Sequence, residues 1–141
     1  LIVPKGHLLT LKEEPTTLQD LQALPLALID NSTGMGRLVH HAQQMSHLNL
    51  SPKLQTNSVS ALKNFVSAGL GVTFMPKLTV LEEVESGEIE IVPTDLEILS
   101  KARVKVQSLK GRALSPQAST LLDFLVENTH FLRSDASGLV R

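Results

Sequence analysis

Between residues 26 and 76 the chain alternates short apolar runs with segments whose apolar residues recur at the helical period. The runs that are short enough to be strands are Leu26–Asp30, Lys53–Thr56 and Gly71–Met75. One helix is expected from Met35 and another from Ser58, because apolar residues recur there about every 3.6 positions. The order strand, helix, strand, helix, strand is typical of right-handed βαβ units. We therefore predict an α/β fold with a mostly parallel sheet.

Weaker signals on both sides extend this pattern. Helix starts are marked by a capping residue or a first-turn proline, at Thr17, Pro76 and Ser115–Pro116. Further strands are expected where a short apolar run ends at proline or where apolar and polar residues alternate, at 1–3, 88–91 and 102–107. The apolar positions expected to face inward on the helices include Leu21, Leu38, Val39, Ala42, Met45, Leu62, Phe65, Leu78 and Leu81.

The composition limits what such a chain can do. With 141 residues, 42% of them apolar, it can bury a core, and without cysteine it has neither disulfides nor thiol chemistry. The 13 basic and 14 acidic residues give a net charge of −1, which disfavours nucleic-acid binding by this chain itself. The longest apolar run, Leu26–Ile29, is far shorter than the roughly 18 residues of a membrane span. The chain begins at Leu1 and not at a Met, so we expect a piece of something longer, and its start shows no signal-peptide pattern.

Polar residues follow two neighbouring strands at the place where open parallel sheets commonly bind ligands, beyond the carboxyl ends of the strands. Ser32 and Thr33 lie in the turn after the first strand, and Thr56, Asn57 and Ser58 follow the second. Their hydroxyl and amide groups, with the unpaired N–H groups of the helix starts, suit a carboxylate, phosphate or sulfate. The same residue types are also the favoured helix caps, so capping is the alternative interpretation. We predict a ligand-binding site at these five residues.

Other candidate chemistry is weaker. His40, His41 and His47 lie close together in the sequence, but no carboxylate accompanies them at the helical spacing, so a solvated polar face is favoured over a metal site. The chain has none of the common motifs for nucleophilic hydrolysis, phosphate-loop or metalloprotease chemistry. We therefore expect a binding module without a metal or a cofactor, and not an enzyme.

Several segments, taken in order, resemble the effector-binding domain of LysR-type transcriptional regulators. The clearest is Asn57–Pro76, which resembles that family's helix followed by the pattern V-x-x-G-x-G-V-x-x-x-P. Leu8 stands where the family usually has a proline. The supporting segments are Val3–Leu9, Thr17–Leu21, Leu24–Leu26, and Leu114–Pro116 with Phe124–Leu125.

The resemblance implies the effector-binding domain of a bacterial regulator, with the two-lobed fold of the type 2 periplasmic binding proteins. Residues 16–95 would form the complete second lobe, residues 1–8 and 100–130 part of the first lobe, and residues 131–141 a flexible tail. In this family a small inducer lies between the lobes. It is contacted by the helix start that matches Asn57 and Ser58 and by the turn that matches Ser32 and Thr33.

The same resemblance implies the partners. We expect a small, anionic effector, and DNA contacts only through an N-terminal helix-turn-helix outside this chain. We also expect self-association through the helix after Ser115, and a cytoplasmic location without membrane contact. A solute-binding protein of the same fold is the competing class. It would need a signal peptide and usually aromatic ligand contacts, and neither is visible in the sequence. An enzyme built on this fold is a more distant alternative.

Overall fold

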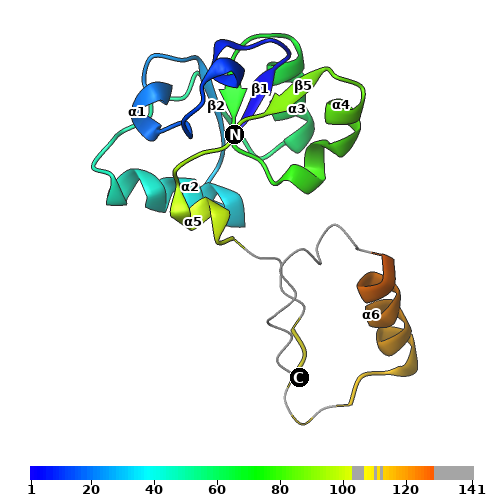
Figure 1. The fold of residues 1–141 in the computed structure, drawn as a ribbon. Helices are drawn as coiled ribbons and strands as arrows, with labels where there is room; N and C mark the ends of the chain where they lie inside the picture. Colours follow the sequence, from blue (N-terminus) through cyan, green and yellow to red (C-terminus); the bar gives the residue numbers. More distant parts are fainter. Residues whose placement is uncertain (103–106, 110, 112, 129–141) are drawn as a thin grey trace. The chain divides into compact units, whose positions relative to one another are not determined.

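The computed structural model of the chain describes residues 1–102, 107–109, 111 and 113–128, whose course Figure 1 shows. The chain divides into two units, Leu1–Ala102 and Arg103–Arg141. The first unit carries the sheet and all five predicted site residues. Among the described residues, no helix is long and apolar enough to cross a membrane.

Within the first unit, five strands form one mixed sheet in the order β3-β2-β4-β1-β5. The strands are β1 Ile2–Pro4, β2 Leu26–Ile29, β3 Leu54–Thr56, β4 Val72–Thr73 and β5 Ile89–Ile91. Strand β2 runs parallel to both β3 and β4, whereas β1 runs antiparallel to both β4 and β5. The predicted parallel βαβ units therefore form the half of the sheet centred on β2.

Helices cover both faces of the sheet, because successive side chains of a strand point to opposite faces. On one face, Leu26 and Leu28 pack in a cluster with Val39, and on the other Ala27 packs with Leu62. The first cluster includes residues of α1 Leu18–Leu21, α2 Gly34–Met45 and α5 Glu97–Ser100, and the second includes residues of α3 Val59–Ser67 and α4 Leu81–Glu85. Burial on both faces explains why β2 is a continuous apolar run.

Two glycines allow close approaches around β2. A Cβ atom at Gly36 of α2 would lie 1.9 Å from the carbonyl oxygen of Asp30, and one at Gly71 would lie 2.1 Å from that of Pro25. Any larger residue would therefore push the backbone apart. The sequence needs glycine at both positions for α2 and β4 to pack against the segments that flank β2.

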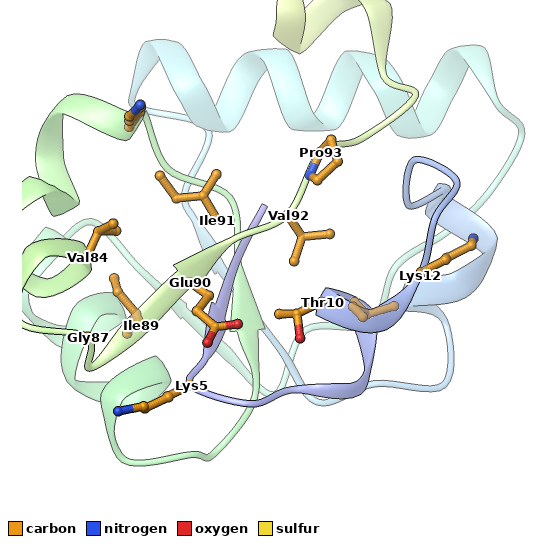
Figure 2. A pocket seen from close by; sticks show the side chains of 12 residues that line it. Lys5, Thr10, Lys12, Val84, Gly87, Ile89, Glu90, Ile91, Val92 and Pro93 are labelled. Carbon is orange, nitrogen blue, oxygen red and sulfur yellow. The ribbon is translucent and has the colours of Figure 1, made fainter.

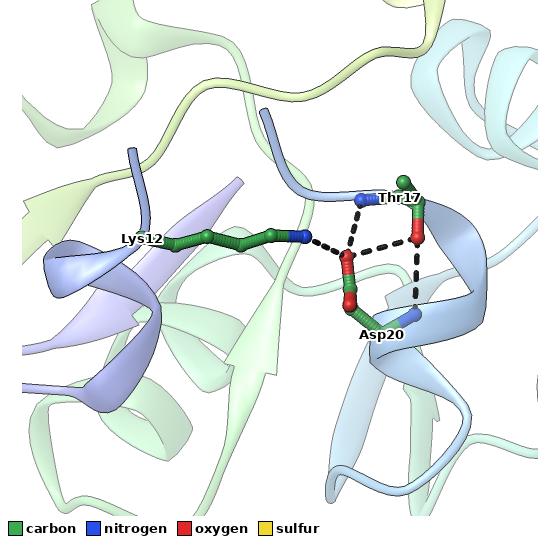
Figure 3. Close-up of polar contacts among 3 residues, drawn as sticks. All are labelled: Lys12, Thr17 and Asp20. Carbon is green, nitrogen blue, oxygen red and sulfur yellow. Dashed lines mark hydrogen bonds and ion pairs between the residues drawn. The ribbon is translucent and has the colours of Figure 1, made fainter. Parts of the chain in front are cut away.

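The capping residue predicted at Thr17 is confirmed, and it forms a capping box with Asp20 at the start of α1 (Figure 3). The Thr17 hydroxyl accepts a hydrogen bond from the Asp20 N–H at 3.2 Å, and Asp20 Oδ2 accepts from the Thr17 N–H at 2.8 Å. Lys12 Nζ also donates to Asp20 Oδ2 at 2.6 Å. The Lys12 ammonium and the Thr17 donors lower the pKa of Asp20 from its ordinary 3.8 to about 2. This network joins α1 to the 3-10 turn η1, Leu8–Leu11.

Strand β1 lies in the same sheet as β2, because Ile2 pairs with Thr73 of β4 and with Ile91 of β5. The division of the chain into lobes, with 1–8 and 100–130 in the first, stays a prediction. Ile2 and Val3 are both buried, one in each core cluster. The cause is pairing between segments about 70 and 90 residues apart, which no local pattern in 1–8 reveals.

The helix expected to begin at Pro76 is divided. Residues Lys77–Val80 form the 3-10 turn η2, and α4 begins only after it, with Gly87 following in the left-handed conformation at φ 72°. Val80 is fully buried and its φ of −130° breaks the helical path. The register therefore shifts, and Leu78, expected inward, is 42% exposed.

Met45 was also expected inward and is 71% exposed. It is the last residue of the 12-residue helix α2, whereas β2 beneath it has only four residues. Twelve helical residues span roughly 18 Å and four strand residues roughly 13 Å, so the end of α2 extends past the strand. The strand expected at 102–107 falls largely on residues outside the described part of the chain.

In the second unit, the helix predicted after Ser115–Pro116 is α6, Pro116–Asn128, and Ser115 Oγ accepts a hydrogen bond from the Ala118 N–H at 3.2 Å. None of the described residues of α6 is buried, and Leu121 and Phe124 are each 59% exposed. The tail expected at 131–141 lies outside the described residues.

Candidate functional site

The two predicted site segments meet at one edge of the sheet. Strands β2 and β3 are parallel neighbours, with Ile29 opposite Thr56 in the register. The next residue, Asp30, donates its backbone N–H to the carbonyl oxygen of Thr56 at 3.0 Å. The carboxyl ends of both strands therefore lie side by side, and α2 and α3 both begin beyond this edge of the sheet.

At the α2 end, Ser32 and Thr33 are both held by Asp30. Thr33 is the N-cap of α2, and its Oγ1 accepts from the Gly36 N–H at 3.0 Å while donating to the Asp30 carbonyl oxygen at 3.0 Å. Asp30 Oδ1 accepts from the Ser32 N–H at 2.9 Å and also from the Ser32 hydroxyl. Both hydroxyl protons of this turn are thus engaged within the turn itself.

The α3 end has hydrogen-bond donors that are not engaged in this way. Ser58 is the N-cap of α3, and its Oγ accepts from the Ala61 N–H at 3.2 Å. Thr56 Oγ1 accepts from the Ser58 N–H at 3.1 Å. Asn57 is exposed, and its side-chain amide makes no hydrogen bond with the described residues. Hydroxyl protons on Thr56 and Ser58 and the amide of Asn57 are available to a ligand.

Positive charge dominates between these helix starts. Arg37 extends back over the turn and donates from Nη1 to the carbonyl oxygens of Ser32, at 3.0 Å, and Asn31, at 3.4 Å. In the part of the chain that the structure describes, no carboxylate forms an ion pair with Arg37. Neither α2 nor α3 has an acidic residue in its first turn. Within the helices themselves no carboxylate offsets the partial positive charge of either N-terminal end, and the nearest one is Asp30 in the turn before α2.

Helix α3 is also tied to α4 by an ion pair between Lys63 and Glu83. The Lys63 ammonium lowers the pKa of Glu83 below its ordinary value. Both side chains are largely covered, so the pair holds the body of α3 in place while its N-terminal end faces the candidate site.

The three histidines lie elsewhere on α2 and beyond it. His40 and His41 are exposed, His40 Nε2 lies 3.2 Å from Gln44 Nε2, and His47 follows the helix with a φ of 52°. No three histidine, aspartate or glutamate side chains come together to hold a metal ion within the described residues.

A groove that the sequence gives no sign of runs along β5 (Figure 2). Its volume is about 550 Å³, and it is lined from four separate parts of the first unit, including Lys5, Thr10, Lys77 and Glu90. None of the five predicted site residues lines it. A smaller cavity of about 160 Å³ lies between α2 and the β2–β3 edge, with Asn31 and Gln55 among its lining residues.

Comparison with known proteins identifies the family. The family model of the LysR substrate binding domain matches residues 1–129. This chain belongs to that family. The assignment favours the class of regulators over the solute-binding proteins that the sequence left as the competing class.

The relatives of known name are regulators as well. A probable RuBisCO transcriptional regulator of Trichormus variabilis is 26% identical over 98 residues, which are 67% of this chain and 29% of the relative. A protein of the same description from Trieres chinensis is 31% identical over 98 residues, which are 65% of this chain and 31% of the relative. The chain thus spans less than a third of the length of these relatives.

Solved structures of LysR regulatory domains share the fold. The regulatory domain of Synechocystis CcmR in complex with 2-PG superimposes with a TM-score of 0.75 at 22% identity, covering 95% of this chain and 62% of that one. The effector binding domain of QuiR in complex with shikimate gives a TM-score of 0.57 at 19% identity, covering 89% and 58%. The predicted fold class is confirmed.

Proposed function

We propose that this chain is the effector-sensing part of a LysR-type transcriptional regulator and that it binds a small anion at the carboxyl edge of its sheet. The observation that carries the proposal is the register of β2 and β3, which sets side by side the strand ends beyond which α2 and α3 begin. The ligand contacts are Ser32, Thr33, Thr56, Asn57 and Ser58.

The charge of this edge supports an anion. Two helix N-terminal ends without acidic first-turn residues, together with the guanidinium of Arg37, provide donors and positive charge. Domains of the same fold in CcmR and QuiR were solved with the small molecules 2-PG and shikimate. A ligand here would be enclosed by a second lobe of the full regulator, and closure of the two lobes would alter DNA binding by its N-terminal domain.

The contribution of this chain to DNA binding is indirect. Its net charge is −1, and a specific DNA interface needs a concentrated basic face. A mobility-shift assay with the chain alone should therefore show no sequence-dependent complex at low salt, whereas the full regulator should form one.

The test of the proposed function is an effector titration of the intact regulator, read by its DNA-binding response. We expect Asn57→Ala to shift the response to higher effector concentration, because the exposed amide of Asn57 is available to a ligand. Gln55→Ala is the matched control, because it also removes an exposed side-chain amide, from a position in β3 two residues before Asn57 that is not among the five proposed ligand contacts. An unchanged response of both Asn57→Ala and Ser58→Ala would show that these residues only shape the start of α3.

A further inference from the structure

The 3-10 turn η1 exposes two leucines beside the groove along β5. Leu8 and Leu11 are 80% and 78% exposed, and, three residues apart in a 3-10 turn, they lie on the same side of it. The turn is well anchored, because Thr10 donates its N–H and its hydroxyl to the His7 carbonyl oxygen, at 2.9 and 2.7 Å. Leu9 and Thr10 of the same turn line the groove. The two leucines are therefore presented to solvent by a fixed part of the fold.

Strand β5, which also lines the groove, has an open backbone edge at Ile91. It is the last strand of the sheet, and only β1 pairs with it in the described part of the chain. Val92 exchanges two hydrogen bonds with Leu1, its N–H donating at 2.8 Å and its carbonyl oxygen accepting at 3.1 Å. Because backbone groups along an antiparallel strand face alternate sides, the N–H and the carbonyl of Ile91 face away from β1. Neither group has a partner among the described residues, and Ile91 is 38% exposed.

The chain itself pairs with the continuation of this outer edge. The Pro93 carbonyl oxygen accepts from the Thr16 N–H at 2.9 Å, and the Thr16 carbonyl oxygen accepts from the Asp95 N–H at 3.1 Å. Thr16 forms only an isolated parallel bridge, which the residues before it do not continue toward Ile91. The outer edge therefore accepts a strand-like partner and is left free at Ile91.

The charge of the groove indicates which partner fits. Three lysines, Lys5, Lys12 and Lys77, line the groove together with one glutamate, Glu90. Lys12 pairs with Asp20, whereas Lys5 and Lys77 are exposed and form no ion pair with the residues that the structure describes. A second copy of this chain would bring the same lysines to the same place, and like charges disfavour that contact. An acidic partner is favoured instead.

We propose that the groove along β5 binds an extended, acidic segment of a partner protein, with one residue paired to the backbone of Ile91 and carboxylates near Lys5 and Lys77. Successive side chains of such a segment point to opposite sides, and the groove has two walls to receive them. Figure 2 shows Ile91 and Val84 on one side of β5 and Thr10 on the other. This surface is separate from the proposed anion site, because none of the five site residues lines it.

The experiment titrates synthetic peptides into the whole chain at constant pH and ionic strength, and follows the nitrogen-15 amide signals of Ile91 and Leu11. The first peptide alternates valine and threonine and carries two glutamates at each end. The second has lysine in place of each glutamate. The third is the acidic peptide with its three central residues N-methylated, so that neither of its edges can donate to a strand.

The acidic peptide should produce saturable shifts at Ile91 and bind about tenfold more tightly than the basic one. N-methylation should weaken its binding about tenfold, and so should Ile91→Pro, which removes an outward N–H without breaking a bond of the sheet.

Two variants with matched controls test the side chains. Lys77→Glu should weaken binding about threefold, whereas Lys53→Glu, an exposed lysine before β3 at the opposite edge of the sheet, should leave it unchanged. Leu11→Ser should weaken binding about fivefold, whereas Leu70→Ser, an exposed leucine between α3 and β4, should not.

Other outcomes would overturn the proposal. These are the absence of saturable shifts at Ile91, equal affinity for the acidic and basic peptides, or undiminished binding of the N-methylated peptide. That last comparison uses the unsubstituted chain, so it tests backbone pairing even if Ile91→Pro does not fold. Self-association without peptide that Ile91→Pro abolishes would show that a second copy occupies the edge, which would also overturn the proposal.

Discussion

Gly36→Ala tests the close approach of α2 to β2 on which the candidate site depends. The new Cβ would lie 1.9 Å from the Asp30 carbonyl oxygen and 2.9 Å from that of Ile29. Ordinary contact begins near 3.4 Å, so helix and strand must separate by about 1.5 Å at this point. Both nearest groups are backbone, which cannot rotate away as a flexible side chain would.

Such overpacking costs about 3 kcal/mol, and the better helix propensity of alanine returns at most about 1 kcal/mol. We therefore expect Gly36→Ala to lower the free energy of unfolding by about 2 kcal/mol or more. Gly34→Ala is the matched control in the first turn of the same helix, where the nearest atom to a new Cβ is Arg37 Nη2 at 4.0 Å. That substitution should stabilise the chain by about 0.4–1 kcal/mol.

Urea denaturation followed by far-ultraviolet circular dichroism measures both variants against the unsubstituted chain. If Gly36→Ala and Gly34→Ala have free energies of unfolding within about 0.5 kcal/mol of each other, α2 does not approach Asp30 as described. The geometry of Thr33 and Asp30 at the site would then have to be reconsidered.

Three further outcomes are expected. Ser58→Ala should lower the free energy of unfolding by about 1 kcal/mol because it removes the cap of α3, whereas Asn57→Ala should change it by less than about 0.5 kcal/mol. Equal losses of unfolding free energy for the two variants in urea denaturation would refute the assignment of Ser58 as the cap. The stability that the lowered pKa of Asp20 contributes is complete above pH 3.8 and is lost as the pH falls toward about 2. In this range the free energy of unfolding should therefore fall more steeply with pH in the unsubstituted chain than in Asp20→Asn, and equal slopes would contradict the prediction. Because α6 exposes Leu121 and Phe124, the chain should self-associate, and Phe124→Glu should lower the molar mass measured by light scattering toward that of the monomer. A molar mass of the monomer at high concentration in the unsubstituted chain would contradict this prediction.

The parts of the fold that were predictable are those whose causes are local. The buried strand β2 is a continuous apolar run, and α3 carries Leu62 and Val66 one helical turn apart. The placement of β1 was not predictable in this way, because Ile2 is held by Thr73 and Ile91, far along the chain.

The candidate site shows the same division. Its position follows from chain order, since polar residues after two parallel neighbouring strands must meet at one edge. What the sequence could not show is which protons are already engaged. That depends on Asp30 accepting from Ser32 and Thr33 donating back to the Asp30 carbonyl, both of which are details of turn geometry.

The hydrogen bond from the Asp30 N–H to the Thr56 carbonyl oxygen also fixes the spacing of the two strand ends at the candidate site. Neighbouring strands lie about 4.8 Å apart, and this spacing is set by backbone hydrogen bonds that cannot stretch. Thr33 caps α2 after the turn 30–32, which the Asp30 and Ser32 side chains hold, and Ser58 caps α3 one residue after Asn57, so the sheet sets the point from which both connections start. A ligand that contacts both caps must therefore span two connections that start from a fixed strand spacing. Among homologous acids that differ by one methylene, we expect the affinity to be highest at a single chain length and not to change gradually with length.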